Sequence, residues 1–463
     1  MPGTFSAFLP QIEQMRIHLI AVGGAVMHNL ALALQDNHHT VSGSDDEIYD
    51  PARSRLAAAG LLPDWMGWDE ARITPDIELV ILGMHARADN PELLRAQALG
   101  LPIQSFPEYI AAHGRDKLRV AVCGSHGKTT TTAMIMHVLR HCGRDFDYLV
   151  GAQLEGFETM VRLSDAPVLI VEGDEYLSSA IDRNPKFLHY RPQLTVITGI
   201  AWDHINVFPT EAEYIRQFER LLITLPAGGA LMYDSTDPIL KEVVRQTPEG
   251  ITRWPYTALP VQQNQRIRFA KAGWHLRVFG AHNYKNMAAA RLVCAELGID
   301  GEAFFGAMES FTGAAKRLDD FYEDTDRRVW KDFAHAPSKV RATTAAVKAR
   351  YPERPLTAVL ELHTFSSLNQ DFLPQYAGAL DAADRAFVYY SPHTLAMKRL
   401  PVLDADTVRL AFGRPDLEVL TEADALEAAV ATEAENLLLM SSGRWDGFDW
   451  AAELQRKSGR PSA

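Results

Sequence analysis

A glycine-rich stretch, CGSHGKTTTT at residues 123–132, is the first place where residue types and spacing could do chemistry. It follows the apolar run KLRVAV and leads into TAMIMHVLR, which predicts a strand, a loop and a helix. The backbone amides of such a loop, together with the helix N-terminus, bind phosphate oxygens. Lys128 would then reach the β- and γ-phosphates of a nucleotide, and Thr129 would place its hydroxyl on Mg²⁺. Val122 stands where the full motif has a glycine, so a plain glycine-rich turn is the alternative.

Acidic residues at the end of another predicted strand indicate a metal site. The stretch APVLIVEGDE (166–175) predicts a buried strand that ends in Glu172, Asp174 and Glu175. One or two carboxylates with phosphate oxygens suffice for Mg²⁺, and Glu172 is the favoured ligand. A solvated acidic turn is the alternative. His204, in the WDH that ends the predicted strand 193–204, could bind a second cation, although a lone histidine is more often structural.

A third group of polar residues stands at the start of an alanine-rich helix, in GAHNYKNMAAA (280–290). Asparagine at a helix start is usually a cap. His282, Asn283 and Asn286 together could instead contact a nucleotide base or phosphate.

These residues need elements to position them, and the pattern of strands and helices predicts three consecutive α/β domains, at 1–114, 115–313 and 314–463. The first opens as a Rossmann-like unit over 16–45, with Gly23–Gly24 in its turn but an incomplete glycine pattern. The further predicted elements are strands at 77–86, 101–106, 328–334, 355–362, 385–391 and 436–442, and helices at 211–222, 338–350 and 422–434.

Composition excludes several classes of protein. The chain has 463 residues and a formal net charge of −13, which disfavours sequence-independent binding to nucleic acid. Its three cysteines, Cys123, Cys142 and Cys294, form neither a disulfide framework nor a metal pattern. The start has no signal peptide, and no apolar stretch approaches the roughly 18 residues of a membrane span, so a cytoplasmic protein is expected.

Taken together, the motifs resemble those of the Mur ligases, ATP-dependent amide-forming enzymes of peptidoglycan assembly. The resemblance covers residues 16 to about 445 and rests on six stretches in the family's order: GSHGKTTT, VEGDEY, WDHINVFPT, GAHNYKNMAAA, FTGAAKR and KDFAHAPSKVRAT. The opening IHLIAVGGAVMHNLA and the DFAHAP element are similar to the branch that uses UDP-N-acetylmuramate. That branch adds either L-alanine or the tripeptide L-Ala-γ-D-Glu-meso-diaminopimelate. PKFLHYRP (185–192) and LLLMSSGRWDG (437–447) are more similar to the recycling, tripeptide-adding type.

The resemblance implies a three-substrate mechanism. The lactyl carboxylate of the muramate takes the γ-phosphoryl group of ATP, and the acceptor amine attacks the acyl phosphate. Lys128, His204, Arg317 and His335 are the implied catalytic residues, with Mg²⁺ on Thr129, Glu172 and His204. The ATP-binding residues that it implies are Gly124, Ser125, His126, Gly127, Lys128, Thr129, Thr130, His282, Asn283, Asn286, Arg317 and Asp332.

Two further binding sites follow from the same resemblance. Gly23, Gly24, Ser44, Asp45 and His85 would bind the UDP-sugar, and His363, Thr364 and Ser366 would bind the acceptor. Departures from the family concern the metals and the acceptor. No lysine lies between Lys186 and Lys241 to bridge two metals, and ELHTFSSLN (361–369) stands where recycling ligases often carry an arginine.

Other classes of function explain less. A GTPase usually carries Asn-Lys-x-Asp, which does not occur here. A Rossmann oxidoreductase would leave the phosphate loop without a role, and a non-catalytic scaffold would not need Lys128, Thr129, Glu172, His204 and Arg317. The expected partners are UDP-N-acetylmuramate and an amino acid or peptide, without nucleic acid or membrane insertion, for a monomer or weak homodimer.

Overall fold

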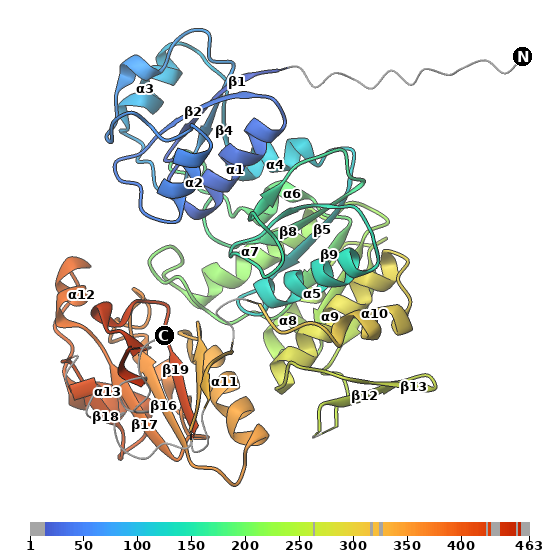
Figure 1. Cartoon of the computed structure of the whole chain (residues 1–463), viewed down its shortest axis with the longest axis vertical. Coiled ribbons are helices and arrows are strands. Elements are labelled where there is room, and N and C mark those ends of the chain that lie inside the picture. Colours follow the sequence, from blue (N-terminus) through green and yellow to red (C-terminus); the bar gives the residue numbers. More distant parts are fainter. Residues whose placement is uncertain are drawn as a thin grey trace, which may run out of the picture. The chain divides into compact units, whose positions relative to one another are not determined.

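The computed structural model describes residues 14–262, 264–314, 318–323, 327–422, 425–426, 436–450 and 452–454. The chain forms two compact units: Met1–Ala121 with Asp145–Pro192, and Val122–Arg144 with Gln193–Ala463. Both contain parallel sheets whose apolar strands are buried (Figure 1). Among the described residues, no helix has the length and apolar character that crossing a membrane requires.

The first unit begins with a four-stranded parallel sheet in the spatial order β2-β1-β3-β4. Parallel neighbours need crossover connections, which helices supply here. Every residue of β3 is buried, as expected for a strand covered on both faces. Its elements are β1 (Arg16–Ile20), α1 (Ala25–Asp36), β2 (Thr40–Ser44), α2 (Ala52–Ala58), η1 (Glu70–Arg72), β3 (Leu79–Leu82), α3 (Pro91–Ala98), β4 (Ile103–Ser105) and α4 (Phe106–His113).

The rest of the first unit is built around β5 and β8, which lie side by side. Next to β8 comes β6, which runs parallel to it, and then β7, which is antiparallel to β6. The chain passes into the second unit at Val122, within β5. These elements are β5 (Leu118–Cys123), β6 (Asp147–Leu149), β7 (Val161–Arg162), β8 (Val168–Gly173) and α6 (Phe187–Tyr190).

The second unit begins with helix α5, which packs on α9 and α10. Buried alanines on α9 at 288–290 allow the close approach, because they leave little side chain between the helices. Strands β9, β10 and β11 are parallel neighbours, and β12 and β13 form an antiparallel hairpin. These elements are α5 (Lys128–His141), β9 (Leu194–Ile197), α7 (Glu211–Ile223), β10 (Ala230–Asp234), α8 (Pro238–Val244), β11 (Thr252–Tyr256), β12 (Arg266–Phe269), β13 (Ala272–His275), α9 (Ala281–Glu296) and α10 (Gly301–Met308).

A six-stranded sheet completes the second unit, in the order β14-β15-β19-β16-β17-β18. Only β14 among these strands is antiparallel to its neighbour. The carboxyl ends of β15, β16, β17 and β19 therefore meet at one edge, where open parallel sheets bind ligands. The elements are β14 (Asp319–Glu323), β15 (Arg328–Asp332), α11 (Pro337–Arg350), β16 (Leu356–Glu361), η2 (Leu373–Tyr376), β17 (Arg385–Tyr389), α12 (Pro392–Met397), α13 (Ala405–Phe412), β18 (Glu418–Leu420), β19 (Asn436–Met440) and η3 (Trp445–Gly447).

The predicted α/β class is confirmed, and each predicted strand contains an observed one. The strand predicted at 77–86 is shorter and ends at Leu82, because the chain turns at 83–86, where the Ala86 amide donates to the Gly83 carbonyl at 3.2 Å. Eight strands within the described residues were not predicted from the sequence: β6, β7, β10, β11, β12, β13, β14 and β18. Of the predicted helix 422–434, only Ala425 and Leu426 within it are described as helical, and most of it lies outside the described residues. The domain boundaries at 114 and 313 stay a prediction.

A buried carboxylate fixes the connections around β5 in the first unit. Asp147, at the start of β6, is fully buried and accepts hydrogen bonds from His113 (2.8 Å), Lys117 (2.7 Å) and Ser164 (2.6 Å). Burial favours the neutral acid, but these hydrogen bonds outweigh it and lower the pKa of Asp147. The carboxylate thus ties the end of α4 and the residue before β5 to β6.

We expect Asp147→Asn to lower the free energy of unfolding by about 3–5 kcal/mol at neutral pH, because it leaves Lys117, whose side chain is only 11% exposed, without its counter-charge. Asp145→Asn is the matched control, since Asp145 pairs with Arg162 at the surface and should contribute less than about 1 kcal/mol. Thermal unfolding followed by circular dichroism measures both. The folded-state pKa is depressed, so the stabilisation exists above the unfolded pKa of about 3.9 and is lost as pH falls through the folded pKa. Equal midpoints for the two variants at neutral pH would contradict this.

Candidate active site

The phosphate loop lies between β5 and α5. Gly124 has φ 120° and Gly127 has φ 82°, both in the left-handed region that favours glycine. A Cβ on Gly124 would collide with the Thr198 hydroxyl, and one on Gly127 would collide with the Asn286 amide. The N-cap residue of α5 is Gly127, which has no side chain to cap the helix. The loop therefore has the geometry of an anion site at a helix N-terminus.

Lys128 is the first residue of α5, and its ammonium group donates to the Gly124 carbonyl at 2.6 Å. This hydrogen bond holds the cation over the loop, where phosphate oxygens would compete with the carbonyl for it. Thr129 and Thr130 follow in the first helical turn, and both are buried. The predicted phosphate-binding residues are thus brought together around one loop.

Residues outside the loop determine its shape. Thr198, just after β9, donates from its hydroxyl to the carbonyls of Cys123, at 3.1 Å, and His126. Ser125 is buried, and its hydroxyl contacts the Tyr214 hydroxyl at 2.8 Å and accepts from the Ala201 amide at 2.8 Å. Ser125 therefore anchors the loop. Thr198 was not predicted as a site residue, because it lies within the predicted strand 193–204 and belongs to no recognised motif.

Helix α9 supplies the second group of predicted ATP-binding residues. Asn286 lies against Gly127, whereas Asn283 donates to the Phe279 carbonyl at 2.8 Å and so helps to begin the helix. Burial lowers the pKa of His282 to about 4, so its imidazole is neutral at pH 7. Of the three residues, Asn286 is the one in contact with the phosphate loop.

Asp203 is a buried carboxylate of the second unit that interacts with several predicted catalytic and acceptor residues. Asp203 accepts from the backbone amide of His204 at 2.7 Å and from the hydroxyl of Ser366 at 3.2 Å. Burial favours the neutral acid, but the charges of His204, Lys339 and His335 outweigh it and lower the pKa of Asp203. His204 itself has φ 55°, a strained conformation for a histidine. The sequence analysis did not assign Asp203 or Lys339 to the site.

Of the predicted ATP-binding and catalytic residues at the start of the third predicted domain, only Asp332 and His335 are described. The carboxylate of Asp332 accepts from the amides of Leu318 (2.7 Å) and Ala334 (2.6 Å), so it ties the residue before β14 to the residues after β15. Arg317 lies outside the described residues. His335 contacts the Phe333 carbonyl through Nδ1 at 2.8 Å.

In the predicted acceptor loop, the Thr364 hydroxyl accepts from the Ser367 amide at 3.0 Å, which closes a tight turn. Thr364 is therefore partly occupied in shaping this loop. His363 stands at its start and is about one-third exposed.

The first unit carries the remaining predicted metal ligand. Glu172, at the end of β8, is buried and accepts from the Gly151 amide at 2.9 Å. Asp174 pairs instead with Lys186 at 2.6 Å. Thr129 and His204, the other predicted ligands, belong to the second unit, and the metal site stays a prediction.

The predicted UDP-sugar residues surround the first glycine turn. Asp45 accepts from the Gly23 amide at 2.7 Å, and burial raises the pKa of this carboxyl to about 7. A cavity of about 290 Å³ opens beside the turn. It is lined by Gly23, Ala25, His28, Glu47, Tyr49, Asp50, Pro51, Ala52, Arg55, Gln153 and Met160. Gly24 precedes α1, and His85 lies exposed in the turn after β3.

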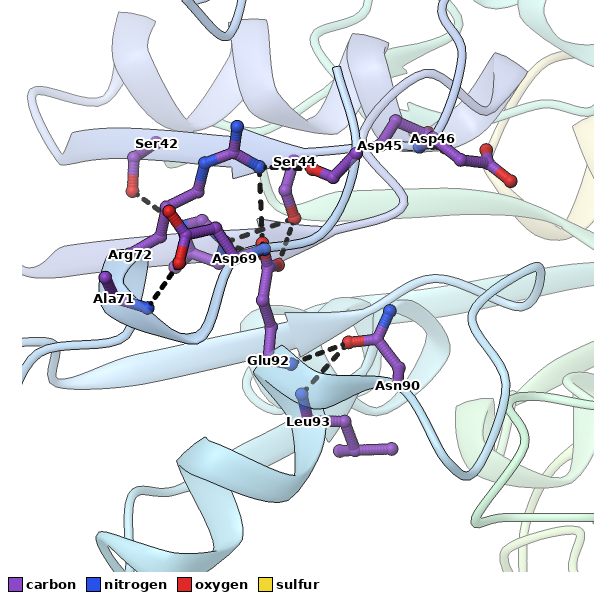
Figure 2. Close-up of polar contacts among 12 residues, drawn as sticks. Ser42, Ser44, Asp45, Asp46, Asp69, Ala71, Arg72, Asn90, Glu92 and Leu93 are labelled. Carbon is purple, nitrogen blue, oxygen red and sulfur yellow. Dashed lines mark hydrogen bonds and ion pairs between the residues drawn. The ribbon is translucent and has the colours of Figure 1, made fainter. Parts of the chain in front are cut away.

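Ser44 is not among the residues that line this cavity, and it belongs to a buried polar cluster (Figure 2). Its hydroxyl donates to Glu92, which is fully buried and also accepts from the Asp69 amide at 2.9 Å and from Arg72 at 3.3 Å. His18 completes the cluster, 3.4 Å from Glu92. Ser44 thus holds the end of β2, and through it positions Asp45.

Comparisons with known proteins agree with this architecture. Residues 16–117 match the Mur ligase family, catalytic domain, and residues 122–294 match the Mur ligase middle domain. A protein of Arthrobacter sp. (strain FB24) named UDP-N-acetylmuramate–L-alanine ligase is 32% identical over 388 residues, covering 81% of this chain and 80% of that protein. A UDP-N-acetylmuramate–L-alanyl-γ-D-glutamyl-meso-2,6-diaminoheptandioate ligase of Haemophilus influenzae is 28% identical over 452 residues, covering 93% and 97%. A murein peptide ligase structure from Psychrobacter arcticus matches with a TM-score of 0.67 at 23% identity, covering 97% of this chain and 100% of that one.

The fold and these matches define an ATP-dependent carbon–nitrogen ligase. The chain belongs to the Mur ligase family, and it has the family's three-domain α/β fold. The family resemblance predicted from the sequence is confirmed.

We expect Thr198→Val to weaken ATP binding roughly tenfold, because two loop carbonyls lose a buried hydrogen-bond donor. Thr198→Ser keeps the hydroxyl and should bind ATP nearly as well as the natural chain. Calorimetric titration with a non-hydrolysable ATP analogue measures the difference. Equal affinity for the Val and Ser variants would show that Thr198 does not shape the loop.

Proposed function

We propose that the chain joins UDP-N-acetylmuramate to L-Ala-γ-D-Glu-meso-diaminopimelate in an ATP-dependent reaction. The observation that supports this proposal is the Asp203 cluster: Ser366 of the predicted acceptor loop donates to Asp203, and the charges of the predicted catalytic histidines His204 and His335 act on the same carboxylate. The nearly full-length match to the Haemophilus influenzae ligase and the stretches 185–192 and 437–447 favour the peptide as acceptor.

The proposed chemistry has two steps. A lactyl carboxylate oxygen attacks the γ-phosphorus of ATP, ADP leaves, and an acyl phosphate forms. The acceptor amine then attacks the acyl carbon, and inorganic phosphate leaves with both electrons of the carbon–oxygen bond. Lys128 and the amides at the start of α5 would bind the γ-phosphoryl oxygens throughout the transfer. The ammonium group of the acceptor must lose a proton before attack, and His335 is the proposed base.

The residues present fit Mg²⁺ as the cofactor. A buried carboxylate at a strand end, Glu172, and a hydroxyl in the first turn after a phosphate loop, Thr129, are oxygen donors of the kind that Mg²⁺ uses with phosphate. When bound, the ion would neutralise charge on the phosphates. His204 is the proposed ligand of a second cation.

A second candidate function is the addition of L-alanine, favoured by the 32% identity to the Arthrobacter ligase. Both functions use a nucleotide-linked sugar and ATP, so we propose a cytoplasmic location. A monomer or weak homodimer stays our expectation.

Phosphate release with ATP, Mg²⁺ and UDP-N-acetylmuramate tests the acceptor directly. We expect turnover with the tripeptide and at least about a hundredfold lower kcat/KM with L-alanine, a gap of roughly 2.7 kcal/mol in transition-state binding. Omitting UDP-N-acetylmuramate is the control for basal ATP hydrolysis. Turnover with L-alanine alone would replace the proposed function by the second candidate.

A further inference from the structure

The loop that follows β19 is held in one strained shape. Trp445 has φ 53° and Asp446 has φ 49°, and Gly447 follows with φ 87°. Successive left-handed residues other than glycine cost free energy, and they persist only where the surroundings fix them. The loop lies at the carboxyl edge of the six-stranded sheet, beside the predicted acceptor residues.

A buried carboxylate fixes this loop. Glu361, at the end of β16, is 2% exposed and accepts from the Ser441 hydroxyl and from the Trp445 amide, with 3.2 Å to each of its oxygens. The Tyr389 hydroxyl, at the end of β17, donates to Asp446 at 3.0 Å. The ends of β16, β17 and β19 thus hold this loop in place.

The same loop packs directly on the predicted acceptor residues. A Cβ on Gly443 would lie 2.6 Å from the ring of His363 and 2.8 Å from Glu361. The absence of a side chain at Gly443 is what allows this approach. Arg444, the next residue, therefore stands one position from the contact with His363.

Two cations gather at this edge. Arg444 is exposed, and within the described part of the chain its guanidinium pairs with no carboxylate. The ammonium group of Lys398 lies 4.5 Å from the centre of the exposed Phe365 ring, and no ion pair of Lys398 is found among the described residues. Burial lowers the pKa of His363, and Lys398 lowers it further, so Lys398 is electrostatically close to His363.

We propose that Arg444 and Lys398 bind carboxylates of the acceptor and select a peptide with several carboxylates over L-alanine. This inference rests on the proposed function, and it names residues of the acceptor site that the sequence analysis did not assign. A guanidinium forms paired, charge-assisted hydrogen bonds with a carboxylate. In this chain Arg444 would supply the charge that recycling ligases often place in the 361–369 loop. The strained turn would hold its backbone in a fixed position, which lowers the entropy lost on binding.

The test compares Arg444→Ala, Lys398→Ala and the double variant with the natural chain, using tripeptide, ATP and UDP-N-acetylmuramate. Each single variant should raise KM for the tripeptide by about 10- to 100-fold, with KM for ATP and UDP-N-acetylmuramate unchanged. Arg385→Ala is the matched control, because Arg385 pairs with Glu418 and begins β17, whose other end lies at the binding edge. It should leave KM for the tripeptide unchanged.

A tripeptide whose diaminopimelate carboxylates are amidated separates binding from a structural effect. The natural chain should discriminate against the amidated peptide, and the double variant should lose that discrimination. Unchanged discrimination in the double variant, or an equal rise of all three KM values, would overturn the inference. Failure of the natural chain to use the tripeptide would refute the proposed function itself and this inference with it, whereas tripeptide turnover with unaltered KM in the variants would refute this inference alone.

Discussion

In the second unit, the arrangement of the elements around the phosphate loop depends on how closely they can pack against its backbone. Gly124 and Gly127 carry no side chains, so Thr198 and Asn286 can touch the loop backbone from β9 and α9. Ser125 turns its hydroxyl inward to Tyr214 on α7. One short loop therefore fixes the positions of three surrounding elements, and the same contacts shape it for phosphate oxygens.

Buried carboxylates with several donors recur wherever a loop must be held in place. Asp147 and Glu92 fix connections in the first unit, and Asp203 and Glu361 fix loops in the second. Each accepts from a backbone amide or from side chains of separate segments, which offsets the cost of its burial. The residues of the site can thus lie on loops, because these hydrogen bonds keep each loop in one conformation.

The sequence predicted the fold where the local pattern was strong. The run before Gly124 and the apolar runs at 194–197 and 436–440 are buried strands, and their periodicity and turn residues were sufficient to identify them. Strand β14, with the sequence DDFYE, has no such pattern, because it is an antiparallel edge strand stabilised by its neighbour β15. Its existence depends on tertiary pairing.

The motif residues of the site could be predicted from the sequence, but the residues that hold them in place could not. Lys128, Thr129 and Asn286 belong to recognisable stretches, and the structure brings them to one loop. Thr198, Asp203 and Glu361 act through hydrogen bonds to residues distant in sequence, which no local pattern records. The family resemblance implied a UDP-sugar contact for Ser44, and this stays a prediction; its hydroxyl donates to Glu92, a partner that no local pattern indicated.

The most direct test of the proposed mechanism is to trace a labelled carboxylate oxygen into the released phosphate. UDP-N-acetylmuramate labelled with heavy oxygen in its lactyl carboxylate is incubated with ATP, Mg²⁺, the tripeptide and the protein, and the released phosphate is analysed by mass spectrometry. The account predicts one labelled oxygen in each phosphate released, because the carboxylate oxygen that takes the phosphoryl group leaves with it. Formation of the amide with unlabelled phosphate would contradict the acyl phosphate and with it the proposed roles of Lys128 and the phosphate loop.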